Sequence, residues 1–187
     1  TWPPEDSNSI KHLRTIDAYL GKIVAEFPDA MICITADHDV NHKDECVDIE
    51  KSLAAQNVKV KMAISAERDK YLKHHRGFGG TSYVYLNDIS DIKNVRTALT
   101  KIKGVKTVLT KAEACEKYHL MPTRVGDLVV LADALTVFGS IDTEREKLPP
   151  TYRTHGSEYE LKVPVILYNA PKHPAKDYFN YNKDLIA

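Results

Sequence analysis

Residues 30–38 read AMICITADH, and this stretch decides how the chain is interpreted. Its first six residues, Ala30–Thr35, form a short apolar run between Pro28–Asp29 and Asp37–His38. Such a run, bounded by turn-forming residues, is typical of a strand buried on both faces of a parallel sheet. The run contains Cys33, which we therefore expect to lie in the core.

The segment before this run has helical periodicity. Apolar residues recur three and four positions apart between residues 10 and 27, after the potential cap residues Ser7, Asn8 and Ser9. Pro28–Asp29 should end that helix. A helix that leads into a buried strand is half of an α/β layered domain.

A second apolar run, Val163–Tyr168 (VPVILY), lies near the other end of the chain, and we expect a second buried strand there. Between the two runs, shorter strands alternate with helices. Strands are expected at 58–64, 82–86, 105–109 and 127–132, and helices at 48–57, 89–103 and 111–118. The sequence therefore predicts an α/β core, formed by residues 1–59 and 141–187, that is interrupted by an α+β insert at 60–140.

Composition limits the classes of partner. The chain has 187 residues, with 26 basic and 26 acidic side chains and a formal net charge of zero. This balance gives no electrostatic argument for a nucleic-acid polymer or an anionic membrane as partner. The sequence has no apolar run of transmembrane length and no signal-peptide pattern. Its three cysteines are odd in number and lack close spacing, which favours a reducing compartment over a disulfide scaffold, and we expect a cytoplasmic protein.

Asp37 and His38 are the first candidates for chemistry. They follow the apolar run directly, and ligands of open α/β sheets bind where strands end. A carboxylate and an imidazole on one turn can share a divalent cation such as zinc. His155 precedes the second apolar run by a short loop and could approach the same edge. From spacing alone, a turn with a capping aspartate remains the commoner explanation of an Asp-His pair.

Two segments resemble a known superfamily. ITADHDVNHK, at 34–43, resembles the Thr-Ala-Asp-His segment of the alkaline phosphatase superfamily. THGSEYELKVPVILYNA, at 154–170, resembles its later His-Gly segment and the Val-Pro strand that follows. Within the superfamily, the resemblance is to phosphonoacetate hydrolase and the type I phosphodiesterase/nucleotide pyrophosphatases. It covers most of this chain but only the C-terminal portion of such an enzyme.

The resemblance implies an alkaline-phosphatase-like sheet core with the insert as a cap domain. It also implies two divalent metal ions, expected to be zinc, and a small anionic phosphonate or phosphate ester as substrate. Asp37 and His38 would bind one metal, and His155 would bind the other. The nucleophile and the other ligands of such a site would precede Thr1, so this chain alone should be inactive.

Three other groups of residues could contribute to a site. Lys43, shortly after the Asp-His pair, is a candidate substrate-binding residue. The basic residues Lys70, Lys73 and 74–76 could bind an anion, although a solvated helix end is the commoner explanation. Cys46 and His42 could form a nucleophile–base pair, but surface pairs at this spacing are common and we discount it.

Two functions follow from these observations. The first is the C-terminal portion of a two-zinc hydrolase that cleaves a phosphonate or phosphodiester. The alternative is a non-catalytic module with an alkaline-phosphatase-like fold that binds a ligand or a protein partner.

Overall fold

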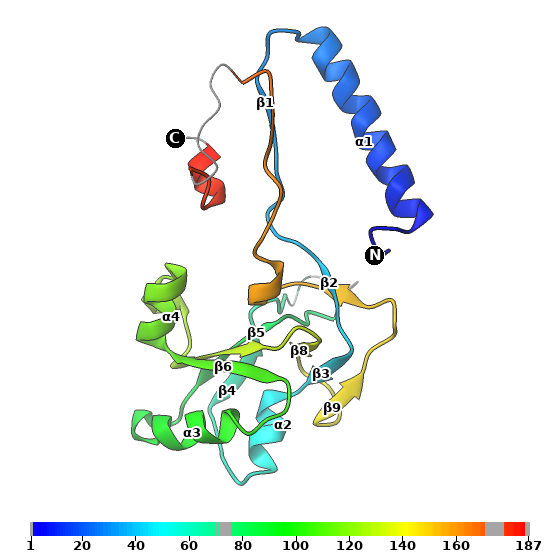
Figure 1. The fold of residues 1–187 in the computed structure, drawn as a ribbon. Helices are drawn as coiled ribbons and strands as arrows, with labels where there is room; N and C mark the ends of the chain where they lie inside the picture. The colour runs from blue at the N-terminus through cyan, green and yellow to red at the C-terminus, as the bar shows by residue number, and fades with distance from the viewer. Residues whose placement is uncertain (1, 70, 72–75, 171–177, 186–187) are drawn as a thin grey trace. The chain divides into compact units, whose positions relative to one another are not determined.

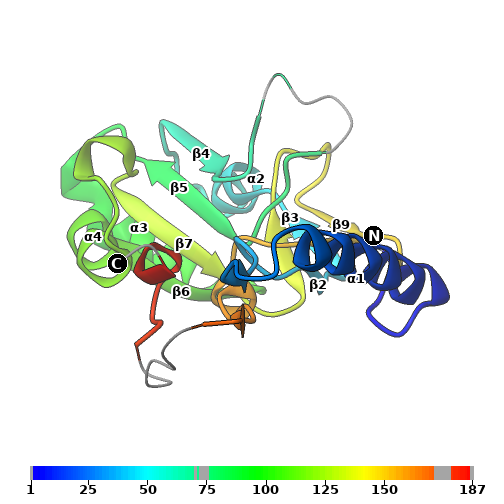
Figure 2. The ribbon, with the colours of Figure 1, turned by 90° about the horizontal axis from the view of Figure 1, so that it is seen from above.

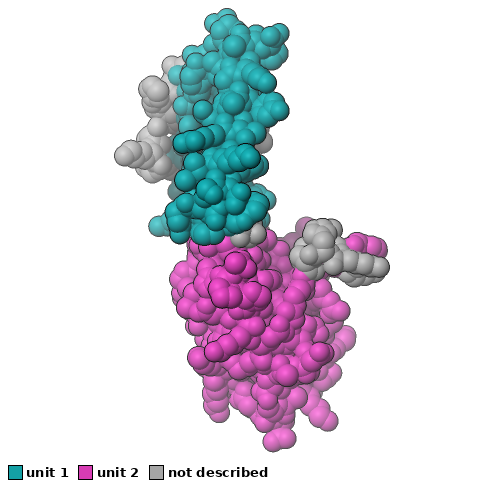
Figure 3. All heavy atoms as spheres, turned by 90° about the vertical axis from the view of Figure 1, so that its right-hand side faces the viewer, with its two compact units in different colours: residues 1–39, 162–187 teal, residues 40–161 magenta. Residues whose placement is uncertain are grey.

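A computed structural model describes residues 2–69, 71, 76–170 and 178–185 of the chain. The chain divides into two compact units (Figure 3). Unit 1 consists of Thr1–Asp39 and Lys162–Ala187, and unit 2 consists of Val40–Leu161. Unit 2 is therefore wider than the insert predicted at 60–140. Its role as a cap domain within a larger enzyme stays a prediction.

Unit 1 contains a long helix and a two-stranded ladder (Figure 1). Helix α1 (Ser7–Glu26) begins where the carboxylate of Asp6 accepts a hydrogen bond from the Asn8 backbone N–H at 2.8 Å. Strand β1 (Ile32–Ile34) pairs antiparallel with β11 (Ile166–Tyr168). A short 3₁₀ helix, η4 (Asn182–Leu185), follows in the described part of the C-terminal segment.

The expected strands at 30–35 and 163–168 exist, but two of their predicted properties are wrong. The two strands pair antiparallel with each other. The prediction failed because an apolar run indicates a strand but does not indicate the direction of the neighbouring strand. Neither strand is buried, and Cys33 is exposed instead of lying in the core. In fact no described residue of unit 1 is buried, because one helix and one ladder do not form two layers around an apolar interior.

Unit 2 is built on a four-stranded antiparallel sheet with helices on both faces. The strand order is β4-β5-β7-β6, visible in Figure 2. The strands are β4 (Met62–Ser65), β5 (Thr81–Tyr85), β6 (Val105–Thr110) and β7 (Leu128–Ala132). The helices are α2 (Ile49–Ala54), α3 (Ile92–Leu99) and α4 (Lys111–Tyr118), with 3₁₀ helices η1 (Ile89–Asp91), η2 (Pro122–Arg124) and η3 (Glu158–Glu160).

Alternation along β7 divides the core between the two faces of this sheet. Leu128 and Val130 face α2 and α3 and belong to the largest apolar cluster, whereas Val129 and Leu131 pack with Ala114 of α4. All five residues of β7 are therefore buried, as expected for a central strand covered on both sides. Figure 1 shows α4 on one face of the sheet and α3 on the other.

Two smaller sheets explain why unit 2 extends beyond the predicted insert. In the first, β3 (Glu45–Val47) lies between β8 (Thr136–Phe138) and β9 (Arg145–Lys147), parallel to β8 and antiparallel to β9. In the second, β2 (Asn41–His42) pairs antiparallel with β10 (Arg153–Thr154). Segments on both sides of the predicted boundaries are thus hydrogen-bonded to one another.

Helix α4 follows the sequence prediction residue for residue. Thr110 and Glu113 form a capping box at its N-terminus, and His119 ends it in the left-handed conformation.

Among the described helices none is both long and apolar enough to cross a membrane.

Candidate functional site

Asp37 and His38 lie in unit 1, on the segment that leaves β1. Their side chains are close, with 3.5 Å between His38 Nε2 and Asp37 Oδ2. The Asp37 side chain is 86% exposed and that of His38 is 35% exposed, so solvent reaches both groups. Asp37 Oδ1 also accepts a hydrogen bond from the His38 backbone N–H at 3.1 Å, which orients the carboxylate toward the imidazole.

A backbone contact selects the tautomer of His38. Its Nδ1 lies 2.9 Å from the carbonyl oxygen of Asp39, and a carbonyl can only accept a hydrogen bond. Nδ1 must therefore carry the proton. In the neutral ring, Nε2 then has a lone pair on the side that faces the Asp37 carboxylate. Histidines that bind metal commonly donate their second ring N–H to a backbone carbonyl in this way.

His155 lies in unit 2, directly after β10. Its Nε2 is 3.5 Å from Oε2 of Glu67, and both side chains are partly buried. The backbone around His155 is attached to the segment that leads into β5. The His155 carbonyl accepts a hydrogen bond from Gly80 N–H at 3.0 Å. Asp37 and His38 belong to one compact unit and His155 to the other.

Lys43 is fully buried in unit 2. Its Nζ donates to Glu160 Oε1 at 2.8 Å and to the carbonyl of Ala134 at 3.0 Å. An ammonium group with no exposed surface and two protein partners is part of the folded framework. Lys43 is therefore not proposed as a substrate contact.

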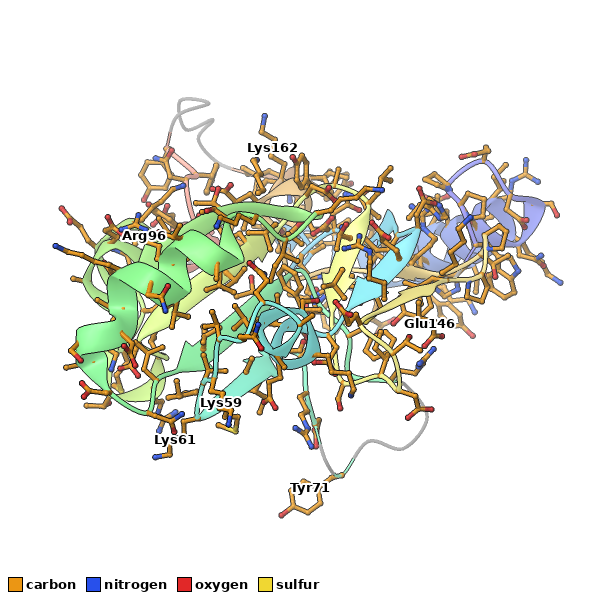
Figure 4. The ribbon with its side chains drawn as sticks, turned by 90° about the horizontal axis from the view of Figure 1, so that it is seen from below. Lys59, Lys61, Tyr71, Arg96, Glu146 and Lys162 are labelled. Atoms are coloured by element: carbon orange, nitrogen blue, oxygen red, sulfur yellow. The ribbon has the colours of Figure 1, made fainter. Side chains whose placement is uncertain are left out.

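Most of the predicted basic cluster, Lys70 and residues 73–75, lies outside the described residues. Its described member, Arg76, makes two hydrogen bonds to Glu146 of β9, at 2.5 and 2.7 Å. The guanidinium group also lies 4.3 Å from the centroid of the Phe78 ring. Glu146 is labelled in Figure 4. Arg76 thus serves an ion pair that connects its segment to β9.

A pocket of about 200 Å³ lies in unit 2 beside Arg76. Its lining mixes both signs of charge, with Lys51 and Arg68 opposed by Asp48 and Glu50. Lys51 Nζ is bound to Asp48 Oδ2 at 3.2 Å, and Glu50 Oε1 accepts from Ala63 N–H at 2.7 Å. Arg76 also lines the pocket, so three cationic and two acidic side chains surround it.

The pair of Cys46 and His42 does not form a nucleophile–base dyad. Cys46 is buried in β3, and burial raises the pKa of its thiol to about 12. His42 Nε2 instead lies 2.7 Å from Oδ1 of Asp44. A thiol with that pKa is not a thiolate at neutral pH.

Glu160 is the buried charged residue that the sequence interpretation missed. In the sequence, Glu158 and Glu160 alternate with Tyr159 and Leu161, a pattern typical of an exposed strand face, but no strand forms here. Residues Glu158–Glu160 form the 3₁₀ helix η3, and the Glu160 side chain is only 1% exposed. The pattern Ser157-x-x-Glu160 is a capping box, and it is the sequence feature that indicates a helical turn at this position.

No group of three or more His, Cys, Asp or Glu residues in the described ranges is arranged to hold a metal ion. What the described residues do provide is an exposed carboxylate–imidazole pair in unit 1. Of the predicted ligands, unit 2 contributes His155, on a tightly attached loop.

Comparison with known proteins places this chain in a family. The model of the type I phosphodiesterase/nucleotide pyrophosphatase family matches residues 3–158. Phosphonoacetate hydrolase from Sinorhizobium meliloti 1021, solved with phosphonoformate, superposes with a TM-score of 0.80 at 26% identity. That match covers 94% of this chain and 44% of the enzyme.

Two more distant structures share the fold. Human ectonucleotide pyrophosphatase/phosphodiesterase 5 gives a TM-score of 0.56 at 15% identity, covering 88% of this chain and 42% of its own. An inactive murine form, in complex with AMP, gives 0.55 at 17% identity, covering 88% and 41%. The chain spans less than half the length of these solved relatives. The predicted resemblance and fold class are confirmed, and the chain belongs to the type I phosphodiesterase/nucleotide pyrophosphatase family, with an alkaline-phosphatase-like α/β fold.

Proposed function

We propose that this chain carries part of a two-metal hydrolase site that acts on a small phosphonate or phosphate ester. Asp37 and His38 would hold one divalent ion, expected to be zinc, and His155 would hold the other. Family membership supports hydrolysis of this class. The relatives solved with phosphonoformate and with AMP support a small anionic substrate.

The geometry of Asp37 and His38 carries the proposal. A carboxylate oxygen and an imidazole nitrogen 3.5 Å apart can bind the same ion, since zinc accepts both ligand types at about 2 Å. The Nδ1–H of His38 is engaged by the Asp39 carbonyl, so that Nε2 is the ring atom offered to a metal. Both side chains reach solvent, and a metal ion and its substrate would need that access.

Two metals in such a site would stabilise the attacking and leaving oxygens of an in-line displacement. The contribution of this chain is to hold the ligand atoms. The Asp39 carbonyl holds the Nδ1 side of the His38 ring, and Asp37 is oriented by the His38 backbone N–H. His155 is held through its own carbonyl by Gly80.

The proposed ligand set is incomplete in these 187 residues. A catalytic zinc takes about three protein ligands. Here two residues serve one ion and a single residue serves the other. In addition, no described residue of unit 1 is buried, so this unit has no apolar interior of its own. We therefore propose that the 187 residues alone do not turn over substrate. Activity would require a nucleophile and further ligands from additional polypeptide.

The alternative, a non-catalytic binding module, is favoured by one observation. The described residues contain no group of three potential ligands. In that case the chain would keep the fold of its family without its chemistry. The cytoplasmic location expected from the cysteines stays a prediction under either function.

Zinc titration of the chain, followed by calorimetry, tests the proposed ligands. We expect weak binding that is lost in Asp37→Asn and in His38→Ala. His12→Ala, which removes an exposed histidine from α1, is the matched control and should leave binding unchanged. Binding that survives both site substitutions would remove Asp37 and His38 from the site.

Two further outcomes test the incompleteness of the site. Stoichiometric, tight binding of two zinc ions by the 187 residues would contradict the incomplete ligand set. Hydrolysis of phosphonoacetate by this chain with zinc alone would contradict the proposed inactivity. If zinc has no effect on any of the three ligand side chains, the non-catalytic alternative is favoured.

A further inference from the structure

Glu160 lies at the centre of a buried polar network in unit 2. Its Oε1 accepts hydrogen bonds from Lys43 Nζ at 2.8 Å and from Asn41 Nδ2 at 3.1 Å. Its Oε2 accepts from the backbone N–H of Ser157 at 3.0 Å and from Ser157 Oγ at 2.6 Å. Both carboxylate oxygens are therefore fully engaged. One of them faces β2 and the following Lys43, and the other faces the loop after His155.

The charge balance of this network keeps the carboxylate ionised. Burial opposes ionisation of Glu160, but hydrogen bonds from Lys43, Ser157 and Asn41 outweigh it and hold its pKa below the ordinary value. An ionised carboxylate is the stronger acceptor, so the bonds to Ser157 are charge-assisted. A neutral amide in its place would hold the loop less strongly.

Ser157 is the second residue after His155, and the residues between them are packed against the β5 segment. Gly80 N–H donates to the His155 carbonyl, and Thr81 Oγ1 donates to the Gly156 carbonyl. A Cβ atom at Gly80 would lie 2.4 Å from Cβ of Ser157, so the two segments touch at a point where only glycine fits. Gly156 has a φ of +96°, which also favours glycine.

We infer that Glu160 is a positioning residue for His155. It fixes Ser157, and through Ser157 it holds the His155–Gly156 backbone against Gly80. Glu160 does not contact the proposed metal or substrate. This inference rests on the proposed function only in treating His155 as a ligand. The attachment of the His155–Gly156 backbone by Glu160 does not depend on that role.

Hydrogen exchange of the Gly80 amide measures this attachment directly, because that amide donates to the His155 carbonyl. In Glu160→Gln we expect Gly80 to exchange about tenfold faster, corresponding to the weakening of one charge-assisted hydrogen bond. Exchange at Val130, in the centre of β7, should change much less. A purely structural role for Glu160 would accelerate both amides equally.

Glu158→Gln is the matched control. Glu158 lies on the same 3₁₀ helix and is also ion-paired, but its partners are Lys117 and Lys106. Its carboxylate accepts hydrogen bonds from Lys117 Nζ and the Tyr118 hydroxyl, whereas Ser157 donates to the carboxylate of Glu160. We expect Gly80 exchange in this variant to match that of the unmodified chain. An equal acceleration in Glu158→Gln and Glu160→Gln would overturn the inference.

The double variant Lys43→Met/Glu160→Leu separates stability from positioning. It removes the buried charges together, so the thermal midpoint should recover relative to Glu160→Gln, whereas Gly80 exchange should stay fast because Ser157 has lost its acceptor. Recovery of both quantities would show that Glu160 only stabilises the fold. Should Glu160→Gln fail to fold, Ser157→Ala removes the hydroxyl contacts with Glu160 Oε2 and with the Tyr159 backbone N–H. It keeps the bond from the Ser157 backbone N–H to Glu160 and should produce a smaller acceleration at Gly80.

Zinc added to the same samples keeps the two proposals distinguishable. A zinc-dependent shift of the His155 imidazole resonances tests the ligand role, and weakening of that zinc response by about tenfold in Glu160→Gln is the expected consequence of positioning. If zinc leaves His155 unchanged in the unmodified chain, the ligand role fails. Gly80 exchange still decides whether Glu160 holds the loop.

Discussion

Lys43 and Glu160 form an ion pair with 2.8 Å between Nζ and Oε1, and their side chains are 0% and 1% exposed. The two residues are separated by 117 positions in the chain. Each lies within a few residues of a point where the chain passes between the two compact units, at 39–40 and at 161–162. The pair therefore joins the first and last segments of unit 2.

Lys43→Met should destabilise unit 2 by about 3–5 kcal/mol, because it leaves a buried carboxylate without its main partner. Urea denaturation followed by circular dichroism measures this loss. Lys117→Met is the control, since the Lys117 side chain is 51% exposed and its ion pair with Glu158 is partly solvated. The expected change there is much smaller. Equal losses of unfolding free energy in the two variants would show that breaking the buried Lys43–Glu160 pair is no more destabilising than breaking the partly solvated Lys117–Glu158 pair.

Glu158 should make the stability of unit 2 depend on pH at the acid end. Hydrogen bonds from Lys117 and Tyr118 lower its pKa from 4.5 to about 2. A carboxyl group with a depressed folded-state pKa stabilises the fold fully above its unfolded pKa, and this contribution is lost as pH falls through the folded value. The stability difference between the unmodified chain and Glu158→Gln should thus be constant above about pH 4.5 and shrink toward pH 2. Urea midpoints measured at several pH values test this. A difference that grows on acidification would contradict the assignment.

Cys33 and Cys46 should differ strongly in reactivity. Cys33 is exposed on β1, whereas Cys46 is buried and its thiol pKa is raised to about 12 by that burial. We expect iodoacetamide at neutral pH to modify Cys33 readily and to modify Cys46 only after denaturation. Peptide mass spectrometry measures both sites, and Cys33→Ser identifies the fast reaction. Labelling of Cys46 at the rate of Cys33 would mean that β3 opens easily.

Leu13 and Leu128 should respond differently to the same truncation. Leu13 is 61% exposed on α1, and Leu128 is fully buried in β7. Leu128→Ala should cost about 2–5 kcal/mol, because it removes buried apolar contacts and leaves a cavity. Leu13→Ala should change stability by less than about 0.5 kcal/mol, since the site is largely solvated in this chain. Chemical denaturation of both variants provides the comparison. A large loss in Leu13→Ala would show that α1 is covered in the isolated chain.

Much of unit 2 was predictable from local patterns. The helix at 111–118 and the strands near 82–86, 105–109 and 127–132 are all present. These elements have clear periodicity or clear boundaries, such as the capping box of Thr110 and Glu113. The strand expected at 58–64 is observed at Met62–Ser65, where pairing with β5 begins at Met62 opposite Tyr85. Val58 and Val60 alternate with lysines and pack against the apolar core, but the observed strand does not include them.

The candidate site was predictable only as a list of residues. The Asp-His motif and the later His-Gly segment identified Asp37, His38 and His155, and the family match agrees with the resemblance behind them. Their role as ligands stays a prediction. Lys43 is a candidate from the sequence only because it lies close to the motif along the chain. Proximity along the chain, however, does not tell whether a side chain faces solvent or an acidic partner.

The sequence by itself determined the helices, most strands and the family, because these depend on short-range periodicity and on contiguous motifs. The tertiary structure decided the antiparallel pairing of β1 with β11, the exposure of Cys33 and the burial of Lys43 against Glu160. Each of these depends on segments more than 100 residues apart meeting in space. The free energy of a buried charge or an apolar face depends on what covers it, and no local pattern contains that information.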